Sequence, residues 1–207
     1  MNNSHKKYDP YPAVKIDNRQ WPNNIITKAP TWCSVDLRDG NQALVEPMDS
    51  IRKMRMFKQL VKMGFKEIEI GFPSASETDF NFVRELIVDG HIPSDVTVQV
   101  LTQSRKPLIL KTIESLKGCK NAIMHLYNST STLQREVVFK ETMQGVKKIA
   151  TDGAKIIAEN LHKLNNSNIR LQYSPESFTG TELPYALEVC EAVLDVWNAT
   201  EDKPVII

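Results

Sequence analysis

The sequence predicts an α/β fold built on a parallel sheet, either an open doubly wound sheet or a TIM (β/α)8 barrel. Short apolar or β-branched runs alternate along the 207 residues with segments whose apolar residues recur at helical spacing. Such alternation is typical of strand–helix–strand crossovers, which parallel strands require. The first strand–helix turn, residues 36–42, holds one glycine and no GxGxxG pattern, which disfavours a dinucleotide site. The charged and amide groups of the turns then favour the barrel.

The chain opens on a segment unlike the rest. Prolines interrupt its first thirty residues, which show little hydrophobic periodicity. We expect residues 1–30 to form an extended N-terminal arm and residues 31–207 to form an incomplete catalytic TIM-barrel domain.

Six runs are predicted to be strands because they are apolar or β-branched and bounded by turn formers. They are Trp32–Leu37, Glu67–Phe72, Val96–Leu101, Asn121–Tyr127, Ile169–Tyr173 and Val205–Ile207. A barrel needs eight strands, so we expect this one to be truncated after about the sixth.

The helices between these strands have recognisable ends. Ser50 is expected to cap the first and Gly64 to end it. Ser76 and Asp79 resemble a capping box at the start of the second, and Pro107 can open the third. Two further helices show apolar residues at helical spacing, namely Val146, Ile149 and Ile157, and then Leu183, Ala186, Val189 and Val193.

Composition excludes several classes of protein. With 26 Lys and Arg against 25 Asp and Glu, the net charge is +1 and offers no global attraction for nucleic acid or an anionic membrane. No apolar run is long enough to cross a membrane, and the N-terminus has no signal-peptide core. The three cysteines have no CxxC spacing and are expected to be buried free thiols. A cytoplasmic protein is the simplest interpretation.

Candidate chemistry lies just after the strands. Arg38 and Asp39 either form an ordinary solvated turn, or Asp39 binds a hard divalent cation while Arg38 stabilises an oxyanion and Gln42 adds a hydrogen bond. Glu67 and Glu69 alternate with isoleucines on a predicted buried strand. Buried charges need partners, so one of the two is expected to pair with Arg38.

Two further residues leave alternatives open. His125 ends the fourth predicted strand, where it is either a satisfied core histidine or part of a pocket at the barrel mouth. Glu176 follows the fifth strand, as a helix-start carboxylate favoured by the dipole or as a group facing substrate. Residue types and spacing alone therefore predict only a barrel-like enzyme and leave its dependence on a metal open.

Several motifs in order resemble the 2-isopropylmalate synthase family. They are DLRDGNQAL (36–44), GFPSASETDF (71–80), QVLTQ (99–103), HLYNSTS (125–131) and YSPES (173–177). The resemblance runs from about Lys7 to the end, includes the Trp21-Pro22 arm, and is closest to the longer form of that enzyme.

The resemblance implies a TIM barrel of the pyruvate-carboxyltransferase-like type. It implies a Claisen-type condensation of acetyl-CoA with 2-oxoisovalerate, which gives 2-isopropylmalate and CoA in the first step of leucine biosynthesis. It also implies a divalent metal, with Mg²⁺ favoured over Mn²⁺ or Zn²⁺, and a homodimer at full length.

Roles follow motif by motif. Asp39 matches the family's metal-binding aspartate, and Arg38 matches the arginine beside the ketone oxygen. Glu176 matches the carboxylate near the substrate. The positions that line the oxoacid pocket are matched by Leu101, His125 and Ser174.

One family feature has no counterpart. None of the four histidines lies in the His-x-His arrangement that completes the family's metal site, so this chain alone is expected to be inactive. A related condensing enzyme such as homocitrate synthase is an alternative. A second is a non-catalytic piece that acts as an interaction or dominant-negative protein through exposed sheet edges.

Overall fold

A computed structural model describes residues 4–7, 9, 12, 17–18 and 28–207. The chain divides into two compact units, Met1–Pro30 and Thr31–Ile207. In the first unit, Ser4–Lys7 forms a 3₁₀ helix. Most of the expected arm lies outside the described residues, so its extended form stays a prediction.

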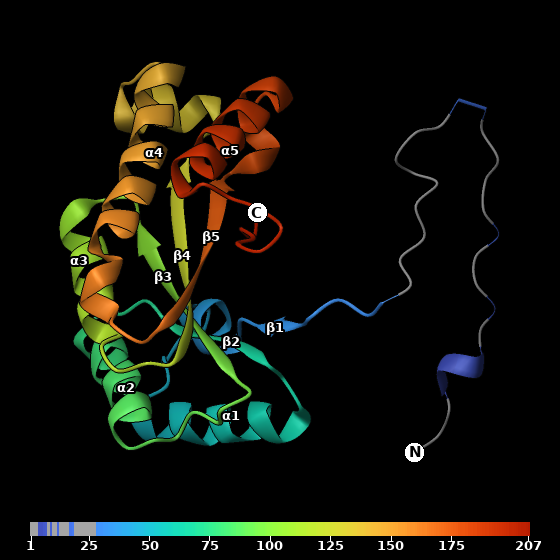
Figure 1. The fold of residues 1–207 in the computed structure, drawn as a ribbon, viewed down its shortest axis with the longest axis vertical. Coiled ribbons are helices and arrows are strands. Elements are labelled where there is room, and N and C mark those ends of the chain that lie inside the picture. Colours follow the sequence, from blue (N-terminus) through green and yellow to red (C-terminus); the bar gives the residue numbers. More distant parts are fainter. Residues whose placement is uncertain (1–3, 8, 10–11, 13–16, 19–27) are drawn as a thin grey trace. The chain divides into compact units, whose positions relative to one another are not determined.

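The second unit is a curled parallel sheet of five strands (Figure 1). The strands are β1 (Cys33–Ser34), β2 (Glu67–Gly71), β3 (Thr97–Gln103), β4 (Asn121–Ser129) and β5 (Asn168–Glu176). Each strand pairs with the next one along the chain, in the order β1-β2-β3-β4-β5. A doubly wound sheet reverses its order at a switch point, and this one does not. The predicted barrel is therefore confirmed. The structure contains five of the eight strand–helix units of a complete barrel.

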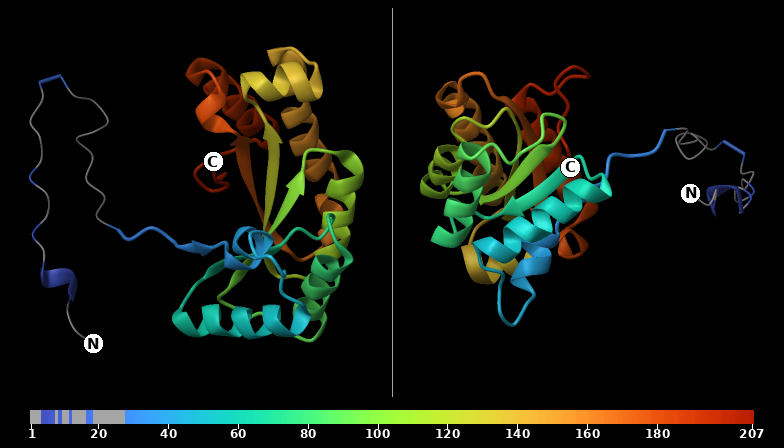
Figure 2. Two further views of the ribbon diagram at one scale, coloured as in Figure 1. Left: turned by 180° about the vertical axis from the view of Figure 1, so that it is seen from behind. Right: turned by 90° about the horizontal axis from the view of Figure 1, so that it is seen from below.

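Five helices lie outside the curled sheet (Figure 2). They are α1 (Ser50–Met63), α2 (Glu77–Val88), α3 (Lys106–Ser115), α4 (Met143–Asn160) and α5 (Leu183–Trp197). The predicted ends hold at Gly64, which has φ +99°, and at Ser76, whose hydroxyl accepts from the Asp79 amide. The predicted cap of α1 is wrong by one residue, because Asp49 rather than Ser50 accepts the free amide of Arg52.

The two faces of the sheet differ in polarity. Residues paired in register point to the same side, and one side carries Ile68, Val98 and Ala122, which are fully buried in the core beneath the helices. The other side carries Glu69 next to Gln99. Strand alternation therefore places an apolar core under the helices and a polar lining on the concave face.

The first strand is much shorter than predicted. Only Cys33–Ser34 pairs with β2, and Asp36–Gly40 forms a single π-helical turn instead of continuing the strand. The amides of Arg38, Asp39 and Gly40 all donate to the carbonyl of Val35, so the chain turns as soon as it reaches the sheet edge.

The later strands run further than predicted, and the last one is shorter. β3, β4 and β5 continue through the polar residues Gln103, Ser129 and Glu176 because the ladder supplies partners for their backbone. Of Val205–Ile207, Ile206 alone forms a parallel bridge, with Gln172 of β5. That bridge extends the sheet in the direction of a sixth strand.

All three cysteines are free thiols, as predicted. Cys119 is buried, but Cys33 and Cys190 are only half-buried. Burial, with the nearby carboxylates of Glu69 and Glu67, raises the pKa of Cys33 to about 12. Across the described part of the chain, no helix combines the length and apolarity needed to span a bilayer.

Candidate functional site

The π turn after β1 presents Arg38 to the concave face at the carboxyl end of the sheet. Its Nε donates to Glu69 Oε1, and its Nη1 lies 2.7 Å from Asp39 Oδ1. The Arg38 side chain is 16% exposed, whereas that of Asp39 is 58% exposed. Arg38 is thus held between a buried and an exposed carboxylate.

Glu69 is the centre of the polar lining. Its side chain is fully buried and accepts from Arg38, from Gln99 Nε2 at 2.5 Å and from His125 Nδ1 at 2.6 Å. Burial by itself raises the pKa of Glu69. The hydrogen bond and charge of His125, with Arg38 and Gln99, outweigh burial and hold this pKa below its usual 4.5. Glu69 is therefore an anion that fixes the surrounding donors.

His125 connects this centre to the neighbouring strand. The carboxylate of Glu69 keeps a proton on Nδ1, while Nε2 faces the Ser174 hydroxyl at 2.8 Å and the Gln172 amide at 3.3 Å. Leu101 is the register neighbour of His125 on β3. Three of the residues predicted to line a pocket, Leu101, His125 and Ser174, are thus brought together on β3, β4 and β5.

The other two predicted residues lie at the rim. Glu176 is exposed at the end of β5 and accepts from the Ser129 hydroxyl. Gln42 is also exposed and lines a cavity of about 650 Å³ that it shares with Arg38 and Phe72. The structure gives neither residue a hydrogen bond to the Glu69 centre.

The Tyr127 side chain is influenced both by Glu176 at the rim and by Arg38 in the network around Glu69. Burial raises the pKa of its phenol, Glu176 raises it further, and Arg38 lowers it. The ring packs edge-on against Phe72 with 6.2 Å between centroids. Its hydroxyl therefore lies in the fields of both predicted catalytic residues.

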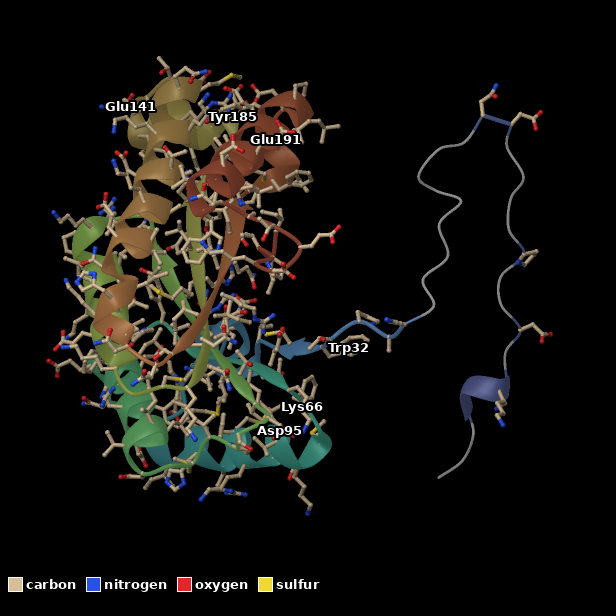
Figure 3. The ribbon with its side chains drawn as sticks, viewed as in Figure 1. Trp32, Lys66, Asp95, Glu141, Tyr185 and Glu191 are labelled. Atoms are coloured by element: carbon tan, nitrogen blue, oxygen red, sulfur yellow. The ribbon has the colours of Figure 1, made fainter. Side chains whose placement is uncertain are left out.

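The amino ends of the strands, at the other end of the sheet, carry exposed charged side chains. Lys66 and Asp95, labelled in Figure 3, form an exposed ion pair next to the amino ends of β2 and β3. Exposed ion pairs of this kind contribute little to stability, and this pair lies apart from the polar network at the carboxyl ends of the strands.

The described residues do not complete a metal site. Asp39 is the predicted ligand, and one of its oxygens already accepts from Arg38. Within the described ranges, no three His, Cys, Asp or Glu side chains lie close enough to hold an ion together.

Sequence reasoning found part of this arrangement and missed part. It predicted that Glu67 or Glu69 would pair with Arg38, and Glu69 does, while Glu67 pairs with Arg170. Gln99 and Gln172 were missed as members of the site. Their two-residue spacing from Leu101 and Ser174 was a usable signal, because alternate residues of a strand share a face.

Comparisons with known proteins identify the family of the chain. Residues 29–201 match the HMGL-like family. A 2-isopropylmalate synthase of Parafrankia sp. is 62% identical over 203 residues, and one of Clostridium acetobutylicum is 59% identical over 205 residues. Each alignment covers 98% of this chain, but only 36% and 37% of the respective relative.

Solved structures show the same fold at much lower identity. The HMG-CoA lyase of Bacillus subtilis superposes with a TM-score of 0.59 at 16% identity, covering 79% of this chain and 53% of that one. The enzyme of Brucella melitensis gives 0.56 at 16% identity, covering 79% of this chain and 56% of that one. The chain thus spans about a third of its curated relatives and about half of the solved barrels.

Proposed function

The chain belongs to the HMGL-like family, and from this premise we propose that it provides part of the catalytic barrel of a 2-isopropylmalate synthase. The proposed reaction condenses acetyl-CoA with 2-oxoisovalerate to 2-isopropylmalate and CoA, in leucine biosynthesis. The proposed setting is the cytoplasm, in a homodimer of the full-length enzyme. The observation that carries the proposal is the Arg38–Glu69–His125 network at the carboxyl ends of the strands, in a chain 62% identical to such a synthase.

Arg38 is proposed to stabilise the alkoxide that forms when an acetyl-derived enolate attacks the ketone. A guanidinium fixed in advance stabilises developing negative charge without reorganising. Glu69 supplies that fixation, because it is buried, anionic and bonded to Nε of Arg38. The remaining N–H groups of Arg38 are left for an oxygen ligand on the concave face.

Leu101, His125 and Ser174 are proposed to contact the oxoacid. Leu101 offers an apolar surface beside His125, and both are only 7% exposed. A branched aliphatic side chain suits such a surface better than a second carboxylate does, since no free cation lies beside Leu101 in the described network. Glu176 is proposed to face the substrate from the rim, with Gln42 hydrogen-bonding from the opposite side.

Asp39 is proposed as one ligand of a divalent cation, with Mg²⁺ favoured over Mn²⁺ or Zn²⁺ because a carboxylate oxygen is a hard ligand. The described residues do not complete that site. Stabilisation of the alkoxide by this chain is therefore assigned to Arg38.

The test is a chimera in which this chain replaces the matching 203 residues of the Parafrankia relative. Thiol release from acetyl-CoA is measured with 2-oxoisovalerate, with 2-oxoglutarate and without an oxoacid. We expect release with 2-oxoisovalerate, identification of 2-isopropylmalate by mass spectrometry, and no release by the 207-residue chain alone.

Other outcomes identify the alternatives. Release with 2-oxoglutarate only would assign a homocitrate-synthase-like enzyme. No release from a folded chimera, while the parent relative is active, would contradict a catalytic role and leave the non-catalytic alternative.

A further inference from the structure

Helix α1 carries a groove on its exposed face, outside the network described above. The groove has a volume of about 520 Å³ and is lined chiefly by Met48, Arg52, Arg55, Met56, Lys58 and Lys62. Four of these side chains are cationic and two are thioethers. Among the described residues, no carboxylate lines the groove.

The positive charge of α1 is not neutralised. The helix SIRKMRMFKQLVKM contains five basic residues and no acidic one. Lys53 alone is buried and paired, with Asp79. The other four cations are exposed and form no ion pair with any residue in the described part of the chain.

The cations form one continuous stripe. Arg52, Arg55 and Lys62 are separated by three and then seven residues, spacings that repeat on one helix face. At 1.5 Å per residue the stripe from Arg52 to Lys62 is roughly 15 Å long. Several anionic groups of one ligand can therefore be bound at once.

The groove lies next to the cavity of the predicted site. Met48 lines both the groove and the cavity of about 650 Å³ that also contains Arg38. The Met48 amide donates to Asn41 Oδ1 at 2.7 Å, which ties the start of α1 to the turn that carries Arg38. A ligand with one end beside Arg38 can thus extend over Met48 onto α1.

We propose that this groove binds the 3′-phosphoadenosine diphosphate of an acyl-CoA, with Arg52, Arg55, Lys58 and Lys62 facing the phosphates and Met48 and Met56 against the adenine. The choice of acyl-CoA rests on the proposed function. Arginine pairs with phosphate through charge-assisted, often bidentate bonds, and methionine sulfur packs favourably against aromatic rings. Cations and thioethers together suit a nucleotide better than they suit a simple anion.

The test measures binding to the 207-residue chain by calorimetry, using CoA, dephospho-CoA, 3′,5′-ADP and pantetheine. We expect CoA and 3′,5′-ADP to bind, dephospho-CoA to bind more weakly, and pantetheine to show no binding at the same concentration. Affinity for CoA should fall with added salt, because the cations are exposed.

A double variant, Arg52→Gln/Arg55→Gln, should weaken CoA binding at least tenfold and leave the thermal midpoint within a degree or two. Lys148→Gln/Lys155→Gln removes the same charge from the exposed face of α4, where each lysine pairs with a carboxylate, and should leave CoA affinity unchanged. Equal affinity of CoA for the chain and the α1 variant, or an equal loss in both variants, would overturn the proposal.

The chimera separates failure of this site from failure of the function. If it is active and the α1 variant raises KM for acetyl-CoA but not for acetyl-pantetheine, both proposals stand. Activity with an unchanged KM for acetyl-CoA would overturn the groove alone. CoA binding that depends on Arg52 and Arg55 in an inactive chimera would overturn the function alone.

Discussion

At the scale of single residues, Glu69 decides how the concave face is organised. It is fully buried, yet it remains ionised because three donors converge on its two oxygens. A buried carboxylate without such partners would protonate instead. Its charge in turn orients Arg38 and fixes the Nδ1 proton of His125.

This arrangement predicts a pH dependence of stability. The pKa of Glu69 is lower in the folded chain than its usual 4.5, so its contribution is complete above about pH 4.5 and is lost as pH falls through the folded value. In that acid range, Glu69→Gln should flatten the slope of unfolding free energy against pH by up to about 1.4 kcal/mol per pH unit.

Urea unfolding between pH 3 and 7 measures this slope. Glu201→Gln changes an exposed glutamate near the C-terminal bridge and serves as the control. Parallel pH profiles for Glu69→Gln and the unsubstituted chain would contradict the ionised, donor-bonded state of Glu69.

The residue scale also shows what the sequence could reveal. A charged partner for Glu67 or Glu69 was predicted because these glutamates alternate with isoleucines on a strand that the sequence predicts to be buried. Gln99 and Gln172 were not found, because a neutral amide carries no such charge signal and only strand alternation relates them to Leu101 and Ser174. Inter-strand register then sets Glu69 beside Gln99 and His125 beside Gln172.

At the scale of elements, a buried ion pair joins α1 to the start of α2. Lys53 is fully buried and pairs with Asp79 Oδ1, while Asp79 Oδ2 accepts the Phe72 amide at 2.7 Å. Gly71 is required there, since a Cβ would lie 2.8 Å from Asp79 Oδ2. The pair therefore fixes the turn that lines the cavity next to Arg38.

Removal of Asp79 should be costly. Asp79→Ala leaves the Lys53 ammonium buried without an anion, and we expect a loss of about 3–5 kcal/mol in unfolding free energy. The exposed pair of Lys148 with Asp152 offers a control, and Asp152→Ala should cost less than about 1 kcal/mol. Denaturant titration of both variants checks the difference, and equal losses would refute it.

Replacing either of two glycines of α4 by alanine should change stability, in opposite directions at the two positions. A Cβ at Gly153 would collide with the Ser104 hydroxyl and lie 3.3 Å from Leu126 Cδ1. A Cβ at Gly145 would meet the Glu141 side chain, most closely at its flexible carboxylate end. We expect Gly153→Ala to destabilise by about 1–3 kcal/mol through overpacking, and Gly145→Ala to be neutral or stabilising by up to about 1 kcal/mol.

Thermal unfolding of the two alanine variants measures this contrast. Whether Gly153→Ala raises or lowers stability depends on how closely α4 packs on the turn after β3. There, Ser104 Oγ donates to the Ile149 carbonyl at 2.5 Å. Stabilisation by Gly153→Ala would mean that α4 packs less closely on the sheet than the structure shows.

Element ends were the least predictable feature. Helix ends were read correctly where a side chain or glycine fixes them, as at Ser76 and Gly64. The first strand was overestimated because the apolar Val35 and Leu37 continue its pattern, while three amides converge on the Val35 carbonyl and end it. That turn depends on backbone hydrogen bonds, which residue types do not encode directly.

At the scale of the whole molecule, an apolar face is exposed on α5 and on the residues beside it. Phe178, Leu183, Leu187 and Ile207 line a groove of about 700 Å³ and are 50–71% exposed. The parallel bridge of Ile206 extends the sheet in the same direction. Exposed apolar faces of this kind drive association.

One substitution on this face should act oppositely in two contexts. Leu187→Lys removes exposed apolar area from the 207-residue chain, and we expect it to reduce self-association by light scattering at fixed concentration. In the chimera, where the following strand–helix unit of the barrel would cover α5, the same change should lower the thermal midpoint by several degrees. An unchanged thermal midpoint of the chimera would mean that α5 stays uncovered there, and unchanged self-association of the 207-residue chain would mean that this face does not drive it.

The fold class was predictable from the whole chain because strand–helix alternation permits few topologies. The neighbour-by-neighbour order of the strands then excluded the doubly wound alternative. The metal site was not predictable in this way, since its proposed ligand Asp39 finds no partner set among the described residues.

The central claim is that the Arg38 guanidinium, fixed by Glu69 on the concave face, stabilises the reacting oxygen. The most direct measurement is kcat for thiol release by the chimera carrying Arg38→Gln, with Lys155→Gln as the control. We expect kcat to fall by roughly 10²–10³-fold for Arg38→Gln, the typical loss when one oxyanion donor is removed, with the control unchanged. An Arg38→Gln chimera that is folded and retains the unsubstituted kcat would contradict the claim.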